Sequence, residues 1–83
     1  MNILEMKQLA AELLKLSDGE VEQYSGVIKE LDALYVSVPI KGGASLIVGR
    51  DGKVLYASSA ISYVKHIEAY KSGKRTPLES FKR

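Results

Sequence analysis

The sequence predicts a single small α+β domain, residues 1–83, with an N-terminal helix, a three- to four-stranded antiparallel sheet and a C-terminal helix. Apolar residues recur at helical spacing over residues 3–16 and again over residues 60–70. Between these segments the chain shows a period of two and is rich in β-forming residues. A sheet with both helices on one face buries both apolar stripes, so we expect two layers.

The N-terminal helix has a clear start signal. Asn2 is a favourable N-cap, and Glu5 three residues later completes a capping box. The apolar face that follows consists of Met6, Leu9, Ala10, Leu13 and Leu16. Asp18-Gly19 predicts the end of this helix, because glycine readily adopts the left-handed conformation that follows a helix.

The next segment, residues 20–32, admits both strand and helix. Polar and apolar residues alternate from Glu20 to Tyr24, which favours a strand. Ser25-Gly26 then predicts a turn or a bulge, and residues 27–31 fit either a second strand or a helical turn. We interpret the segment as strand.

Two strands and a hairpin are expected from residue 33 to residue 57. Residues 34–38 alternate, and Pro39 ends that strand or places it at an edge. Lys41-Gly42-Gly43 predicts a turn before a short apolar strand at residues 45–48. Asp51-Gly52 predicts a two-residue type I′ turn. This register pairs Arg50 with Lys53, Val48 with Leu55 and Ile47 with Tyr56.

The C-terminal helix is expected to begin after Ser58-Ser59 or at Ser62, since serine is a good N-cap in either place. Its predicted apolar stripe is Ala60, Tyr63, Val64, Ile67 and Tyr70. Gly73 predicts its end, and Pro77 prevents its continuation. His66 is expected on the flank of this helix, as a half-exposed boundary residue.

Composition argues against several classes of function. The chain has no cysteine, which removes thiolate metal sites and cysteine nucleophiles, and one histidine, which removes histidine ligand clusters within one chain. The first residues lack a signal-peptide pattern, and no apolar run is long enough to span a membrane. We therefore expect a cytoplasmic protein that is not an enzyme, uses no cofactor or metal and does not bind a membrane.

The charges are unevenly distributed although the net charge is only +2. Seven of the ten acidic residues lie in residues 1–34. If tyrosines are exposed on an open face of the sheet beside an acidic edge, that face is a candidate surface for another protein. The predicted partner-binding residues are Glu20, Glu22, Tyr24, Glu30, Asp32 and Tyr35.

A basic end of the chain supports an alternative. Lys71, Lys74 and Arg75 lie at the end of the predicted helix, with Lys82 and Arg83 in the tail. Cations are favoured at a helix C-terminus for dipole reasons alone, but they also suit an anion site. The alternative function is a small nucleic-acid-binding or phage-type regulatory protein that uses Lys71, Lys74 and Arg75. A homodimer that pairs an open strand edge is a third possibility.

The pattern of residues 43–77 is strand, Asp-Gly turn, strand, small residues, and a helix ending in aromatic-x-x-Gly-x-Arg-x-Pro. It reads here as Leu46-Ile47-Val48, Asp51-Gly52, Val54-Leu55-Tyr56, Ser58-Ser59 and Tyr70-Lys71-Ser72-Gly73-Lys74-Arg75-Thr76-Pro77. This segment, under half of the chain, resembles the C-terminal part of small bacterial immunity proteins, the antidotes to polymorphic toxins that include deaminase-type toxins. The resemblance implies a non-enzymatic inhibitor that masks a toxin. It also implies that Arg75 is architectural and ties the tail back.

Overall fold

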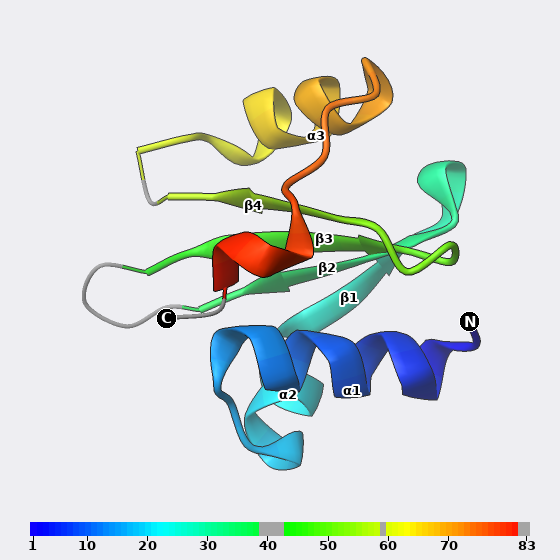
Figure 1. Ribbon diagram of the computed structural model, residues 1–83, viewed down its shortest axis with the longest axis vertical. Helices are drawn as coiled ribbons and strands as arrows, with labels where there is room; N and C mark the ends of the chain where they lie inside the picture. Colours follow the sequence, from blue (N-terminus) through cyan, green and yellow to red (C-terminus); the bar gives the residue numbers. More distant parts are fainter. Residues whose placement is uncertain (39–42, 59, 82–83) are drawn as a thin grey trace.

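The computed structural model describes residues 1–38, 43–58 and 60–81 of the chain (Figure 1). Its elements are α1 (Ile3–Leu14), α2 (Asp18–Tyr24), β1 (Ser25–Ile28), the 3₁₀ turn η1 (Lys29–Leu31), β2 (Ala33–Ser37), β3 (Ser45–Gly49), β4 (Val54–Ala57), α3 (Tyr63–Lys71) and the 3₁₀ turn η2 (Leu78–Phe81). The expected α+β class is confirmed, with N-terminal helices, a four-stranded antiparallel sheet and a C-terminal helix.

The sheet is an antiparallel meander with strand order β1-β2-β3-β4. Leu34 lies opposite Val48, and Val48 lies opposite Val54, so these side chains share one face. Tyr35, Ile47 and Leu55 are the corresponding row on the other face, because successive residues of a strand point to opposite sides. The central strands are therefore apolar on both faces.

The helices cover opposite faces of the sheet, which differs from the expected packing of both helices on one face. Met6 and Ala10 of α1 are fully buried on the face that carries Leu34 and Val48. Tyr70 of α3 packs on the other face, with Ala33, Ile47 and Leu55. Figure 1 shows α1 and α2 below the sheet and α3 above it. A helix is needed on each side because β2 and β3 expose apolar side chains on both.

The interpretation of residues 20–24 as a strand was wrong, because they belong to α2. Ser17 is the N-cap of α2, and its Oγ accepts a hydrogen bond from the Glu20 N–H at 3.2 Å. The Glu20 carboxylate accepts one from the Ser17 N–H at 3.0 Å. This capping box starts a helix whose buried residue, Val21, lies one turn before Tyr24. Asp18-Gly19 thus opens α2, and α1 ends earlier, at a left-handed Lys15 with φ 56°.

The β3–β4 loop is one residue longer than the expected type I′ turn. The Gly52 N–H donates to the Gly49 carbonyl at 3.0 Å, and the Gly49 N–H donates to the Lys53 carbonyl at 2.9 Å. Gly52 has φ +83°, whereas Asp51 is not left-handed, so this is a three-residue loop with a left-handed glycine before β4. The Asp51 Oδ1 accepts the Lys53 N–H at 3.0 Å and stabilises this loop. The expected register is therefore wrong by one residue.

Several expectations concern residues outside the described ranges. The strand end at Pro39, the turn at Lys41-Gly42, the capping role of Ser59, and Lys82 and Arg83 all lie there. Of the two expected starts of the C-terminal helix, Ser62 is the N-cap, and its Oγ accepts the Lys65 N–H at 3.3 Å. Within the described ranges, no helix has the length and apolar character needed to cross a membrane.

We expect Gly49→Ala to destabilise the fold by about 1–3 kcal/mol, the usual range for overpacking. A Cβ at this position meets the Tyr70 hydroxyl at 2.5 Å and the Asp51 Oδ1 at 2.8 Å. Both groups are held, the first on a buried ring and the second by the Lys53 N–H. Urea unfolding measures the change. Gly26→Ala is the matched control, because no atom lies within 4 Å of its added Cβ. Equal midpoints for the two variants contradict this account of the loop.

Candidate functional site

His66 is a buried core residue, not the half-exposed boundary histidine expected from the sequence. It is 1% exposed. Its Nε2 lies 2.8 Å from the Leu55 carbonyl, which can only accept, so Nε2 carries the proton. The Tyr35 ring packs against it, with centroids 5.8 Å apart. The face of α3 that meets the sheet is therefore His66, Ile67 and Tyr70, and Val64, expected in the stripe, points to solvent.

The other ring nitrogen of His66 has no hydrogen-bond partner. Nδ1 is the one buried side-chain polar atom without a partner among the described residues. Burial lowers the pKa of His66, and the bond to the Leu55 carbonyl only partly offsets this. A protonated ring needs an acceptor at Nδ1, so the neutral form is the one that fits. His66 thus anchors α3 to β4.

The four predicted acidic partner residues lie in two separate regions, in α2 and around η1. Glu20 belongs to the cap of α2, where the Ser17 backbone N–H and then its hydroxyl lower the pKa of the Glu20 carboxyl. Glu22 pairs with Lys7 of α1 at 2.6 Å. Glu30 is exposed in η1, and Asp32, just after η1, pairs with Arg50 at 2.6 Å. Each of the pairs joins neighbouring elements.

The two predicted partner tyrosines lie on opposite faces of the sheet. Tyr24 packs against the hydrophobic cluster that contains Met6 and Ala10 of α1. Tyr35 faces α3, where its hydroxyl donates to the Ser45 Oγ at 3.0 Å and its ring meets Tyr63 edge to face at 4.8 Å. The open sheet face on which the partner surface was expected is covered by α3. The structure therefore does not bring the six residues together, and their role in binding stays a prediction.

The end of α3 is built around Arg75. The guanidinium lies over the Tyr70 ring, 3.7 Å from its centroid. Its Nη1 donates to the Tyr70 carbonyl at 2.9 Å and to the Lys74 carbonyl at 2.6 Å. Gly73, with φ +98°, donates to the Tyr70 carbonyl, and the Lys74 N–H donates to the Ala69 carbonyl, which is a Schellman motif. Arg75 thus closes the helix end.

The chain after Arg75 returns to the edge of the sheet. The Thr76 N–H donates to the Val54 carbonyl at 2.7 Å, and the Thr76 Oγ1 accepts the Tyr56 N–H at 2.9 Å. This bridge occupies part of the outer edge of β4. An edge strand that is covered in this way is a poor template for pairing with another chain.

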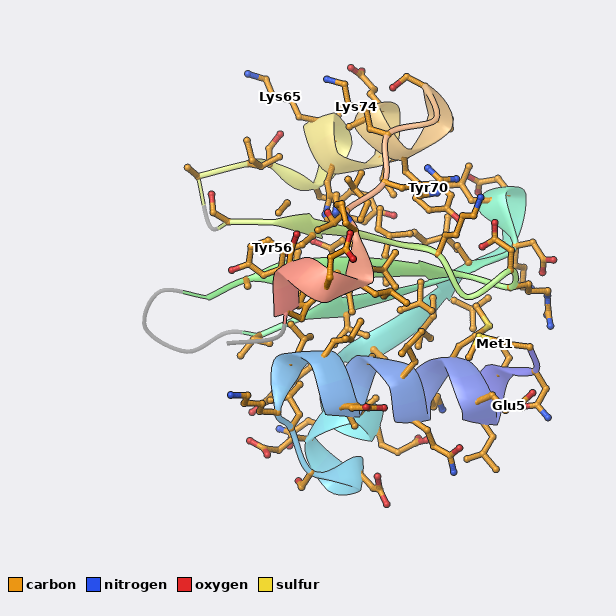
Figure 2. The ribbon with its side chains drawn as sticks, in the orientation of Figure 1. Met1, Glu5, Tyr56, Lys65, Tyr70 and Lys74 are labelled. Carbon is orange, nitrogen blue, oxygen red and sulfur yellow. The ribbon has the colours of Figure 1, made fainter. Side chains whose placement is uncertain are left out.

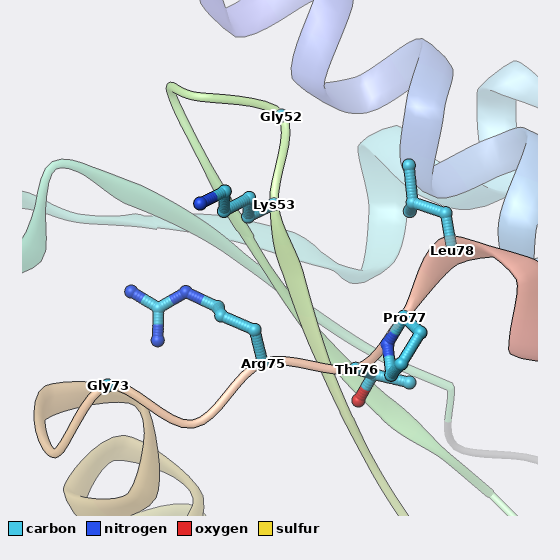
Figure 3. A pocket seen from close by; sticks show the side chains of 7 residues that line it. All are labelled: Gly52, Lys53, Gly73, Arg75, Thr76, Pro77 and Leu78. Atoms are coloured by element: carbon cyan, nitrogen blue, oxygen red, sulfur yellow. The ribbon is translucent and has the colours of Figure 1, made fainter.

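A groove of about 510 Å³ lies between the β3–β4 loop and the chain after α3 (Figure 3). It is lined by Gly52, Lys53, Gly73, Arg75, Thr76, Pro77 and Leu78. Of the three predicted anion-binding residues only Arg75 lines it. Lys74, which follows the end of α3, projects away from the sheet, whereas Tyr70 points towards it (Figure 2). Lys53 was missed, because its only sequence signal is its place directly after the Asp-Gly pair.

The start of α3 carries exposed apolar side chains. Ile61 is 43% exposed, Tyr63 51% and Val64 61%. We call these three residues the α3 patch. They lie within four consecutive positions at the N-terminal end of α3, whereas the groove lies beyond its C-terminal end.

Comparison with protein-family models, with curated proteins and with solved structures gives no match. Among the described residues, no group of three or more His, Cys, Asp or Glu side chains is arranged to hold a metal ion.

We expect the free energy of unfolding to fall as the pH drops below about 6.5, the ordinary pKa of histidine. Below that pH the histidine of the unfolded chain takes up a proton, whereas buried His66 of the folded protein stays neutral. The contribution of His66 to the free energy of unfolding is therefore fully present above that pH and declines below it. One such group changes the free energy by at most about 1.4 kcal/mol per pH unit. Urea unfolding of wild type and His66→Gln, which keeps a donor for Leu55, measures this component. An identical pH dependence in both proteins contradicts the assignment.

We expect Arg75→Ala to lower the stability by about 1–2 kcal/mol, since it removes the stack on Tyr70 and the bonds that close α3. Lys74→Ala is the matched control, because Lys74 is the adjacent exposed cation. Thermal and urea unfolding measure both variants. If Arg75→Ala has the same melting temperature as the wild type, Arg75 does not have the architectural role assigned to it.

Proposed function

We propose that this protein is a small non-enzymatic binding protein that masks a partner protein, in the manner of the immunity proteins that residues 43–77 resemble. The observation that carries the proposal is the α3 patch, in which three large apolar side chains in four positions are exposed. Several exposed apolar side chains close together in the chain are typical of a protein interface.

The α3 patch is unusual because α3 already has another face that packs against the sheet. His66 and Tyr70 already fill the contact with the sheet. Val64 is thus not a core residue left partly uncovered, since it points away from the face that packs. An exposed valine beside an exposed tyrosine also offers the mixture of apolar area and polar tip that interfaces favour.

Two contacts with the sheet hold the residues of the α3 patch in place. The Tyr63 ring contacts Tyr35 edge to face, and the His66 bond to the Leu55 carbonyl holds the next turn of α3. A surface that is already ordered loses less conformational entropy when it binds. A surface that is ordered before binding suits a protein that acts by covering a site on its partner.

We expect Val64→Asp to abolish capture of a partner in a pulldown from the native host, because it places a charge within the patch. The substitution is at the second residue of α3, where an acidic side chain favours the helix. The fold should therefore persist, which circular dichroism checks. The captured partner is identified by mass spectrometry and its stoichiometry is measured.

Leu4→Asp is the matched control for this experiment. Leu4 is the second residue of α1 and is 63% exposed, against 61% for Val64. The control should retain the partner. Equal capture by wild type and Val64→Asp contradicts the assigned surface. Recovery of nucleic acid alone, released at moderate salt, contradicts the proposed function and favours a nucleic-acid binder.

A further inference from the structure

The groove beside β4 brings together two cations that lie far apart in the sequence. Lys53 begins the return from the β3–β4 loop, and Arg75 follows α3. Figure 3 shows their side chains extending in the same direction, Lys53 from the β3–β4 loop and Arg75 from the chain after α3. The ion pairs among the described residues are Lys7–Glu22 and Arg50–Asp32, so neither groove cation belongs to one.

Arg75 is held in place while part of its guanidinium stays available. The stack on Tyr70 and the two bonds from Nη1 fix its plane. No hydrogen bond among the described residues engages Nε or Nη2. These two nitrogens form one edge of the guanidinium, with parallel donors that match the two oxygens of a carboxylate. A fixed fork of this kind loses little entropy when it binds.

Lys53 supplies a second positive charge with different properties. Its backbone N–H is used by Asp51, but its ammonium group has no partner among the described residues. Like charges that share a groove repel each other, and an anion between them removes that cost. The fixed fork of Arg75 and the unpaired ammonium of Lys53 together suit one small oxyanion.

Two apolar side chains also line the groove, which indicates the kind of molecule that carries the anion. Pro77 and Leu78 line it, and Leu78 is 44% exposed. An apolar wall beside a pair of cations fits an acidic residue next to an apolar one in a peptide. Single-stranded nucleic acid favours free aromatic faces for stacking, and here Arg75 already covers the Tyr70 ring.

We propose that this groove binds an acidic side chain or terminal carboxylate of a partner protein, with an adjacent apolar side chain on Pro77 and Leu78. The inference rests on the proposed function and names the chemistry of a second contact with the same partner. Lys53 and the Nε–Nη2 edge of Arg75 hold the carboxylate.

The test is an NMR titration of the ¹⁵N-labelled full chain with acetyl-Leu-Glu-amide as the probe. We expect shifts confined to the amides of Gly52, Lys53 and Gly73 and to the Arg75 side chain. Acetyl-Leu-Gln-amide should bind roughly tenfold or more weakly, the factor for losing a hydrogen bond to a charged group. No localised shift at tens of millimolar probe overturns the inference.

Lys53→Gln is the decisive variant, because the Lys53 side chain makes no hydrogen bond or ion pair with the described residues. It should weaken binding of the acidic probe roughly tenfold or more, whereas Lys74→Gln, outside the groove, should not. Equal loss in both variants overturns the assignment to this groove. Titration with inorganic phosphate and with a short oligothymidylate distinguishes the source of the anion. Tighter binding of either than of the peptide probe also overturns the inference.

The groove and the proposed function fail separately. Capture of one partner by wild type and by Lys53→Gln with equal affinity overturns the groove assignment and leaves the proposed function in place. Failure of the wild type to capture a protein partner overturns the proposed function. The titration with the acidic probe needs no partner protein, so it tests the groove independently of that result.

Discussion

The structure depends on the burial of β2 and β3 on both of their faces. Leu34 and Val48 need cover on one side, and Ala33 and Ile47 need it on the other. Apolar burial is worth about 25 cal/mol per Å², the dominant favourable term in a domain of this size. The two central strands therefore require one helix above and one below, and the C-terminal helix cannot join α1 on the same side.

On the face of the sheet that α3 covers, a series of contacts runs from Gly49 to the groove. Gly49 has no side chain, so the Tyr70 hydroxyl can lie against it. Tyr70 then carries Arg75 on its ring, and Arg75 closes the end of α3. The following residue, Thr76, is bonded to β4. The close packing of Tyr70 on Gly49, next to the β3–β4 loop, thus positions the Arg75 guanidinium at the surface.

Both candidate contact surfaces belong to this second layer. The α3 patch lies at the N-terminal end of α3 and the groove lies beyond its C-terminal end, while the His66 bond to Leu55 holds α3 on β4. The acidic residues of the N-terminal half have a different place. Glu20 caps a helix, and Glu22 and Asp32 pair with cations of neighbouring elements. The layer that α3 forms on the second face of the sheet is therefore the one that we propose meets the partner.

Local signals in the sequence determined the elements whose ends depend on nearby residues. The Asn2–Glu5 box starts α1, Ser62 starts α3, Gly73 ends it, and the alternation around Val36 marks β2. Tertiary structure alone decided that α3 lies opposite α1, that His66 is buried and that Lys53 and Arg75 line one groove. Caps and periodicity act over a few residues and set backbone dihedrals. Burial and the meeting of distant side chains depend on which apolar faces remain to be covered once the sheet has formed.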